Sequence, residues 1–429
     1  MSVELKQSFE NLAKAALHRI KEDGDGIGNF LRGTALFDTE RDEIFTLLGE
    51  FSVAESAIQD TETFDERFGI ANSKRVTLQF IYDFVGRFEV PEFEASKFAD
   101  HWLSFSNEID DENWDYVGIA NLQNFESDLS RIDLCDGISI RGRSYEELRD
   151  SFGWNESRWS AMTRDWQDAG GQSSFILVIE DKIPKSPENI MLSGTAENYT
   201  KAQRILLAMR LHKAGEIRIG NFWDSRNTPL RLFGGIGAVL GGGSNQIPGR
   251  QYNFDSVDVD AVRNLYHMIV RFQREHEDRL QNFSTAIRAF TSIYGRLMQQ
   301  RLDRVIDGIT AMEALLPTNA ELSFKLAFRV AGLLGHDDAS RVKYLRDMKS
   351  YYHTRSAIVH GSRVKVNDTK LINDDEPLRA ILRDLLAGFL HLAESSDYTV
   401  GKQFYDEQLD EILLHASHRD KLRSEMQLS

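Results

Sequence analysis

Residues 174–180 read Ser-Phe-Ile-Leu-Val-Ile-Glu, a short apolar run that is rich in β-branched side chains. Such a run predicts a buried β-strand in the middle of the chain. Apolar and polar residues alternate over residues 131–141 and again over residues 216–220, which is typical of half-buried strands. A helix is expected over residues 200–212. Residues from about 110 to 255 therefore predict a region of mixed α and β structure.

The sequence on either side of this region has a helical pattern. Apolar residues recur at three- and four-residue steps over residues 9–20 and over residues 285–316, and Pro317 predicts the end of the second helix. Further helices are expected over residues 321–334, 338–360 and 378–393.

We therefore expect an α+β multidomain chain of three parts. Residues 1–105 are expected to form a helical N-terminal region, residues 106–258 an α+β regulatory or sensor region, and residues 259–429 a helical domain. The length of 429 residues agrees with this division, because a single hydrophobic core rarely serves more than about 300 residues.

Composition excludes several classes of protein. The hydrophobic content of 41% and the charged content of 28% are those of a globular chain, and the net charge of −16 argues against a general nucleic-acid coat protein. The single cysteine, Cys135, cannot form an internal disulfide or a multi-cysteine metal site. No apolar run approaches the roughly 20 residues that cross a bilayer, and the N-terminus has no secretory signal. We expect a cytoplasmic protein without a membrane partner.

Two features of the sequence are candidate ligand sites. The eleven histidines form no HExxH pair or ligand cluster, so neither a metal nor another cofactor is expected. Residues 234–244 read Gly-Gly-Ile-Gly-Ala-Val-Leu-Gly-Gly-Gly-Ser, and such glycines allow backbone amides to approach a phosphate. The lysine of a phosphate-binding loop is absent, so residues 234–243 are expected to be a flexible connection, with nucleotide binding as the alternative.

The most informative motif is residues 351–362, which read Tyr-Tyr-His-Thr-Arg-Ser-Ala-Ile-Val-His-Gly-Ser. Arg355 and His360 lie roughly 140° apart on an ideal helix and so do not share a face. Gly361 predicts the C-terminus of this helix, which would leave His360 at its end. A capping histidine and a surface arginine are the ordinary interpretation of such a pair.

The charge around this motif differs from that of the rest of the chain. Residues 285–365 contain thirteen Lys or Arg and seven Asp or Glu, a net charge of +6 within a chain of −16. A basic segment of this kind indicates either a phosphate-binding surface or a face that docks on an acidic neighbour.

The segment from Arg355 to His360 resembles the R-x4-6-H motif of HEPN domains, in particular their ApeA-like branch. Residues 303–316 resemble the first long helix of that branch, with Glu313 near its end. Residues 323–334 resemble the next helix, in which Arg329 lies among small and apolar residues. The resemblance covers residues 285–395.

The resemblance implies an all-α helical bundle that forms a homodimer and acts as a metal-independent endoribonuclease, with Arg355 and His360 as catalytic residues. Relatives of this kind serve as toxins in abortive infection, an antiviral defence, which implies a phage-derived trigger or regulatory partner. In many HEPN ribonucleases the residue after the motif arginine is Asn, Asp or His, whereas here it is Ser356. Some HEPN domains are catalytically silent, so a dimerisation module or an RNA- or protein-binding module is the alternative.

The implied chemistry suits these residue types. RNA carries its own nucleophile, the 2′-hydroxyl, and histidine transfers protons near neutral pH while arginine binds phosphate oxygens. The products would be a 2′,3′-cyclic phosphate and a 5′-hydroxyl. Supporting or RNA-binding roles are expected for Tyr352, His353, Ser356, Arg363 and Lys365, with a surface histidine and a solvated basic turn as the ordinary alternatives. Polar residues with structural roles in the bundle are expected to be Asp307, Glu313 and Arg329, with Arg329 paired to Glu313.

Overall fold

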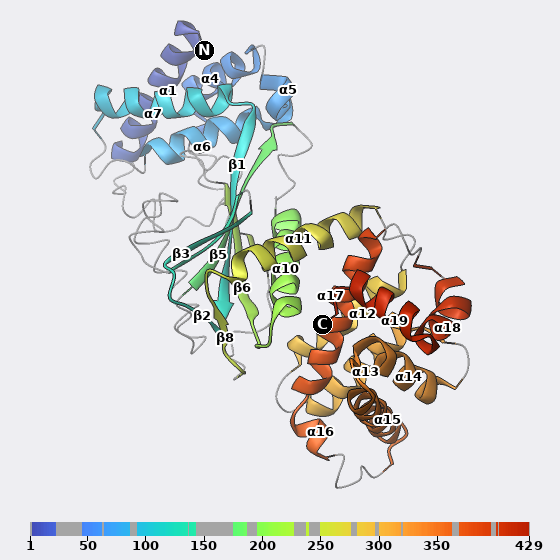
Figure 1. Ribbon diagram of the computed structural model, residues 1–429. Helices are drawn as coiled ribbons and strands as arrows, with labels where there is room; N and C mark the ends of the chain where they lie inside the picture. Colours follow the sequence, from blue (N-terminus) through green and yellow to red (C-terminus); the bar gives the residue numbers. More distant parts are fainter. Residues whose placement is uncertain are drawn as a thin grey trace.

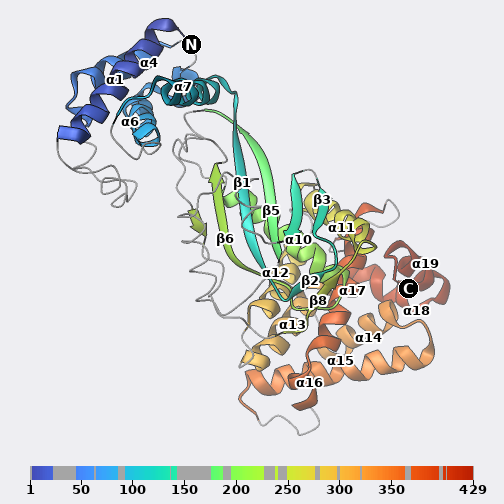
Figure 2. The same ribbon diagram turned by 90° about the vertical axis from the view of Figure 1, so that its left-hand side faces the viewer.

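The computed structural model describes residues 2–22, 45–61, 64–85, 92–135, 137–142, 175–186, 195–226, 237–239, 249–275, 281–296, 300–318, 321–362, 369–395, 400–401 and 403–428. Within these ranges the chain is mainly helical, with a six-stranded antiparallel sheet in its middle, so the expected mixed α+β class is confirmed. Figures 1 and 2 show an elongated molecule, in which the N-terminal helices lie beyond one end of the sheet and the C-terminal helices lie beside its other end.

The N-terminal helices pack through aromatic side chains. Phe9 stands 4.7 Å from Phe80 and 5.1 Å from Phe105, measured between ring centroids. The first helix buries its apolar residues from Leu5 to Ile20, which confirms the helix expected over residues 9–20. The helical part extends to Asp110, a few residues past the expected boundary at residue 105. The helices of this part are α1 (Val3–Glu22), α4 (Gly49–Gln59), α5 (Phe64–Phe68), a 3-10 turn (Ile70–Asn72), α6 (Ser73–Val85) and α7 (Ala95–Asp110).

The sheet has the strand order β3-β4-β5-β1-β6-β7, and each neighbouring pair is antiparallel. A separate parallel pair joins β2 to β8. The strand β5 was expected from its apolar run, whereas β1 was not expected. The strands are β1 (Asn113–Gln123), β2 (Phe125–Ser127), β3 (Arg131–Cys135), β4 (Ile138–Gly142), β5 (Phe175–Pro184), β6 (Arg218–Arg226), β7 (Gly237–Val239) and β8 (Tyr252–Phe254).

The expectation of one strand over residues 131–141 is wrong, because the segment forms a hairpin of β3 and β4. Gly137 adopts a φ of +70°, in the left-handed region that favours glycine. The Asp136-Gly137 dipeptide is a common hairpin signal, so the turn was visible in the sequence.

Two helices connect the sheet to the C-terminal helices. α10 (Thr195–His212) contacts β1, β5 and β6 and also contacts α11 (Asp258–Glu275) and α17 (Glu376–Glu394). Figure 1 shows α10 and α11 between the sheet and the C-terminal helices. One continuous hydrophobic core runs from the sheet through α10 into the helices that follow, whereas the N-terminal helices have a core of their own. Packing of the sheet is therefore coupled to packing of the C-terminal helices.

The single helix expected over residues 285–316 is wrong, because α12 (Gln281–Gly295) and α13 (Arg301–Leu315) are separate and pack against each other. Folding back buries the apolar faces of both helices, which one long straight helix could not do. The helices expected over residues 321–334, 338–360 and 378–393 are confirmed. The remaining C-terminal helices are α14 (Leu322–Leu334), α15 (Asp338–Val359), α16 (Thr369–Asn373), α17 (Glu376–Glu394), a π-helical turn (Phe404–Gln408), α18 (Leu409–Leu414) and α19 (Ala416–Glu425).

In the ranges described above, no helix combines the length and the apolar character needed to cross a membrane.

Candidate functional site

The helix that carries Arg355 and His360 is fixed at its start by a capping box. The Asp337 side chain accepts a hydrogen bond from the backbone N–H of Ser340, and the Ser340 hydroxyl accepts one from the backbone N–H of Asp337. These two bonds satisfy amide groups that lack partners in the first turn of a helix. Farther along α15, Met348, Tyr351 and Thr354 are buried, so one face of the helix is held by the bundle.

The other end of α15 is closed by a Schellman motif, which defines where His360 lies. The backbone N–H of Ser362 donates to the Ala357 carbonyl at 2.8 Å, and that of Gly361 donates to the Ile358 carbonyl at 3.1 Å. Gly361 has a φ of +66°, which this motif requires. The prediction that Gly361 ends the helix and leaves His360 at its terminus is therefore confirmed.

The His360 side chain is exposed, and it makes no hydrogen bond or ion pair with any residue that the structure describes. His353 is exposed in the same way, two turns earlier on nearly the same line of the helix. Both imidazoles can therefore meet a ligand from solvent without displacing a protein contact. Arg363 and Lys365, the predicted RNA contacts past the motif, lie outside the described residues.

Arg355 is only partly accessible, and it is held by Glu313 of α13. An Arg355 nitrogen, Nη2, lies 3.4 Å from Glu313 Oε2, and the two side chains are 26% and 24% exposed. The Arg355 Nε is buried and has no hydrogen-bond partner within the described part of the chain. The Arg355 guanidinium therefore has an N–H group, at Nε, that can donate a hydrogen bond in addition to its ion pair with Glu313.

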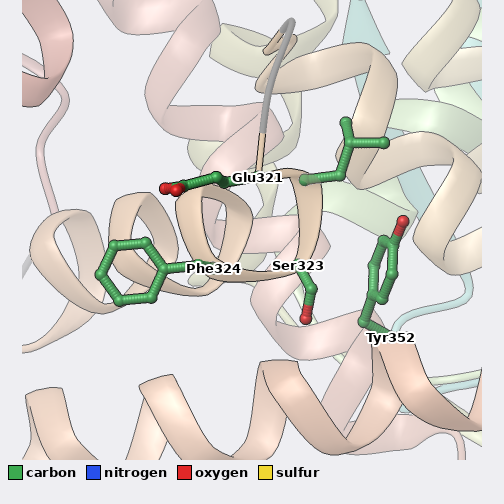
Figure 3. A pocket seen from close by; sticks show the side chains of 5 residues that line it. Glu321, Ser323, Phe324 and Tyr352 are labelled. Carbon is green, nitrogen blue, oxygen red and sulfur yellow. The ribbon is translucent and has the colours of Figure 1, made fainter.

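A shallow depression lies between the start of α14 and the face of α15, one helical turn before Arg355. It is lined by Glu321, Leu322, Ser323, Phe324 and Tyr352, and Figure 3 shows the Phe324 ring and the Tyr352 ring on opposite sides of the first turn of α14. Tyr352 lies three residues before Arg355 and hence on the same side of the helix. Phe324 is 49% exposed. The depression therefore presents aromatic surface one helical turn from Arg355.

The predicted pairing of Arg329 with Glu313 is wrong. Arg329 is 1% exposed and binds Asp410 of α18 through two nitrogens, at 2.7 and 3.2 Å, and it also donates to the Tyr405 carbonyl. Arg329 faces the C-terminal helices, whereas Glu313 faces α15. Burial alone would raise the pKa of Asp410, but Arg329 and Lys325 hold this pKa below its usual value.

The third predicted bundle residue, Asp307, pairs with Arg296 just past the end of α12. An Arg296 nitrogen, Nε, lies 2.8 Å from Asp307 Oδ2, and the second nitrogen lies 3.1 Å from Oδ1. This bidentate contact links α13 to the residue that follows α12, which is consistent with a structural role.

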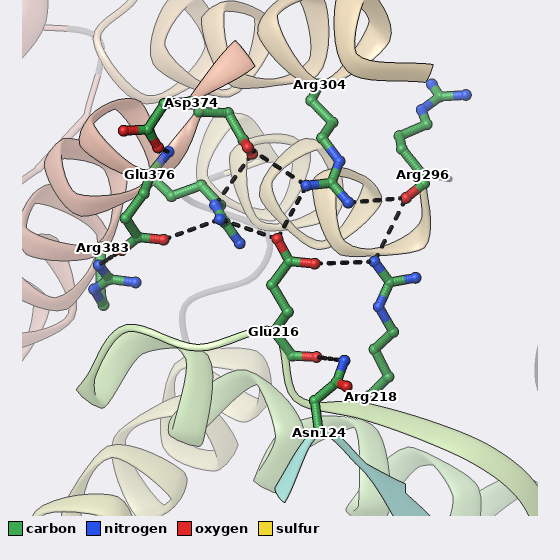
Figure 4. A network of polar contacts seen from close by, with 10 residues as sticks. Asn124, Glu216, Arg218, Arg296, Arg304, Asp374, Glu376 and Arg383 are labelled. Carbon is green, nitrogen blue, oxygen red and sulfur yellow. Dashed lines mark hydrogen bonds and ion pairs between the residues drawn. The ribbon is translucent and has the colours of Figure 1, made fainter. Parts of the chain in front are cut away.

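A buried network of charged residues, which the sequence did not indicate, joins the sheet to the C-terminal helices (Figure 4). Glu216, just before β6, contacts Arg218 of that strand, Arg304 of α13 and Arg379 of α17 at 3.1 to 3.5 Å. Burial alone would raise the pKa of Glu216, but Arg379 and Arg304 hold this pKa below the usual 4.5. No local sequence pattern indicates this network, because its members are far apart in the chain. Glu216 and Arg304, for example, are separated by 88 residues.

Most of the glycine-rich segment lies outside the described residues. Its residues Gly237–Val239 form β7, which pairs with β6 at the edge of the sheet. No group of three histidine, cysteine or carboxylate side chains in the described ranges is arranged to hold a metal ion.

Comparisons with models of known protein families, with curated proteins and with solved structures find no match for this chain.

Proposed function

We propose that the C-terminal helices form a HEPN-type endoribonuclease that cuts RNA without a metal ion, with Arg355 and His360 as its catalytic residues. The observation that supports this most is the capped end of α15, which holds an exposed imidazole with no hydrogen-bond or ion-pair partner in the described ranges. Histidine titrates near neutral pH, so an accessible imidazole at a fixed position suits proton transfer.

The proposed reaction uses the nucleophile that RNA supplies. The His360 imidazole accepts the proton of the 2′-hydroxyl, and the resulting oxygen attacks the adjacent phosphorus. The bond from phosphorus to the 5′-oxygen breaks, that oxygen takes up a proton from water, and the His360 imidazolium returns its proton to the solvent. The products are a 2′,3′-cyclic phosphate and a 5′-hydroxyl. Arg355 stabilises the charge that develops on the phosphorane oxygens, because its guanidinium stays protonated and forms paired hydrogen bonds to phosphate.

The environment of Arg355 suits this role. Its contact with Glu313 is long, at 3.4 Å, and both side chains are about a quarter exposed. A phosphodiester of RNA offers a guanidinium two oxygens for paired hydrogen bonds, whereas the contact with Glu313 is single and long, so RNA can take over this contact. Until RNA binds, Glu313 limits the conformations that Arg355 adopts.

A second copy of the chain would complete the site. Arg355 and His360 point in directions roughly 140° apart on one helix, so one protomer presents them poorly to a single phosphate. Apolar side chains on the same helices are exposed, including Leu322 at 43%, Phe324 at 49% and Val359 at 52%. An apolar surface beside the motif suits a two-fold contact in which two α15 helices face each other.

The proposed cellular role is an abortive-infection effector that is restrained by residues 1–258. An intracellular ribonuclease harms its own host, so such an enzyme needs control. Contacts such as that between Glu216 and Arg304 connect the sheet directly to the helix next to the motif, and they offer a route for that control.

The test is RNA cleavage in the presence of EDTA. Wild-type protein, Arg355→Ala, His360→Ala and the control His18→Ala, which changes an exposed histidine on α1, are incubated with total RNA, and the new termini are mapped. We expect wild type and His18→Ala to leave 2′,3′-cyclic phosphates, and the two motif variants to lose at least 100-fold in rate, as is typical when a general base is removed. Cleavage by His360→Ala at the wild-type rate would contradict the proposal.

The ion pair of Arg355 with Glu313 also supports a second candidate, a catalytically silent module that dimerises or binds RNA or protein. In that case the pair is structural and links α13 to α15. Binding of RNA without cleavage, unchanged in His360→Ala but lost in a variant that remains monomeric, would favour the module.

A further inference from the structure

Five arginines are buried where the sheet meets the C-terminal helices, and they outnumber the carboxylates that contact them. Each of the five is at most 6% exposed. In the described ranges, the carboxylates in contact with them are Glu216, Asp375 and Glu376. Two positive charges are therefore in excess in a place where unbalanced charge is costly. The five arginines are Arg210, Arg218, Arg304, Arg379 and Arg383.

Arg210 is the clearest example of this excess of positive charge. Its Nε and Nη2 atoms both donate to the Ile217 carbonyl, and its guanidinium lies 4.2 Å from the centre of the Tyr294 ring, without a carboxylate in contact. Burial is the main cause that lowers the pKa of Arg210, to about 9, and the neighbouring Arg218 and Arg379 act in the same direction. Within the described ranges, the buried arginines therefore outnumber the carboxylates that contact them.

A cavity of about 570 Å³ opens beside this cluster. Arg304 and Arg379 line it, and each has a buried nitrogen, the Arg304 Nε and the Arg379 Nη1, that has no hydrogen-bond partner in the described ranges. Figure 4 shows Arg304 reaching toward Glu216, with which it forms an ion pair. Buried donors of this kind require a partner, which in a charged cavity is water or an anion.

The entrance of the cavity is also basic. Arg250 and Arg301 line it, and neither forms an ion pair within the part of the chain that the structure describes. Arg301 donates only to the Asn373 side chain, at 3.2 Å. Asp374, which is exposed, opposes this positive field. The buried carboxylates of the wall are each paired with a buried arginine, so Arg250 and Arg301 are the lining cations that have no carboxylate partner in the described ranges.

We propose that this cavity binds a small molecule that carries phosphate, of about the size of a nucleotide. Guanidinium groups form paired hydrogen bonds to phosphate oxygens, and Arg304 and Arg379 have donors left over. The volume lies in the range of about 300 to 1,000 Å³ that small-molecule sites occupy. A phosphate here would give the free donors of Arg304 and Arg379 a partner, and it would lie between the helices and the segments that lead into β6 and β8. The proposal does not depend on RNA cleavage.

The test is isothermal titration of the full-length protein with ATP, AMP and inorganic phosphate, each against a chloride control. The double variant Arg250→Ala/Arg301→Ala changes the entrance, where both residues are exposed or half-exposed, so folding is preserved. Arg288→Ala is the matched control, because Arg288 is an exposed arginine on α12 away from the cavity. We expect saturable binding by wild type and Arg288→Ala, and a loss of tenfold or more in the double variant.

The three ligands identify the source of the phosphate. Tighter binding of ATP or AMP than of phosphate shows that a nucleotide occupies the cavity, and equal affinities show that the phosphate group alone is recognised. His360→Ala and Arg355→Ala should bind the ligand as wild type does, which separates this site from the proposed ribonuclease. The proposal is overturned if none of the three ligands binds saturably, or if the double variant binds as tightly as wild type.

Discussion

Gly361 is the residue on which the position of His360 depends. Its φ of +66° costs an alanine about 1 kcal/mol, whereas glycine adopts it freely. No atom lies within 4 Å of a Cβ built at this position, so the backbone and not crowding limits the substitution. We expect Gly361→Ala to unwind the last turn of α15 and to lower the rate of RNA cleavage at least tenfold, with the free energy of unfolding changed by only about 1 kcal/mol.

Gly295→Ala is the matched control for this prediction. Gly295 also ends a helix, α12, and a Cβ there meets no atom within 4 Å, but its φ is not positive. Alanine should therefore be tolerated there, with cleavage unchanged. If both glycine variants retain full activity, the position that the Schellman motif gives to His360 does not matter for cleavage.

The local part of the candidate site was predictable from its residues. Gly361, directly after His360, marks the end of α15, and this signal depends only on residues within one or two turns. The partners of the arginines were not predictable in the same way. Arg329 and Glu313 lie on neighbouring helices, but sequence gives no rotation of one helix against another. Arg329 instead reaches Asp410, 81 residues away.

At the scale of the element, the ion pair of Arg329 with Asp410 joins α14 to the C-terminal helices. Arg329→Met keeps most of the side-chain volume but leaves Asp410 without its main partner and two backbone carbonyls without a donor. Because removal of one member of a buried pair strands the other, we expect a loss of about 3 kcal/mol in the free energy of unfolding, measured in urea.

Lys325→Met provides the comparison. Lys325 contacts the same carboxylate at 3.3 Å, but its side chain is 34% exposed, so this pair is partly screened by solvent. We expect a loss of less than about 1 kcal/mol. Equal losses in the two variants would show that burial does not set the strength of these contacts.

Helices with clear local sequence signals were predicted correctly. Elements whose burial or limits depend on contacts with distant parts of the chain were not. The helices α14, α15 and α17 lie where expected. The strand β1 was missed because it is buried on both faces along most of its length, so its sequence does not alternate. The two helices α12 and α13 have one continuous apolar pattern, and only the packing of one against the other shows that the chain folds back.

At the scale of the whole molecule, the network around Glu216 makes the contact of sheet and helices sensitive to acid. Arg379 and Arg304 hold the pKa of Glu216 below 4.5, against the tendency of burial to raise it. A carboxylate whose pKa is lower in the folded state stabilises the protein above its unfolded pKa, and this stabilisation is lost as the pH falls through the folded pKa. We expect the melting temperature of wild type to fall steeply below about pH 4.5.

The variant Glu216→Gln isolates this effect. It removes the titrating group, so its melting temperature should be lower than that of wild type at pH 7, and the two should approach each other toward pH 3. Glu4→Gln, which changes an exposed carboxylate on α1, should follow wild type throughout. A constant difference between Glu216→Gln and wild type from pH 7 to pH 3 would show that this carboxylate does not carry the pH dependence.

A composite active site makes a prediction about mixed assemblies. If two copies of α15 supply Arg355 and His360 to one cleft, a protomer that lacks both residues will inactivate the wild-type protomer with which it pairs. The Arg355→Ala/His360→Ala double variant should then lower the activity of a fixed amount of wild-type protein when it is added in excess, at concentrations where sedimentation shows exchange of protomers.

Arg288→Ala, which keeps the motif, should add activity instead. If the double variant leaves the wild-type rate unchanged although mixed dimers form, each protomer contains a complete site, and the apolar surface of Leu322, Phe324 and Val359 has a role other than catalysis.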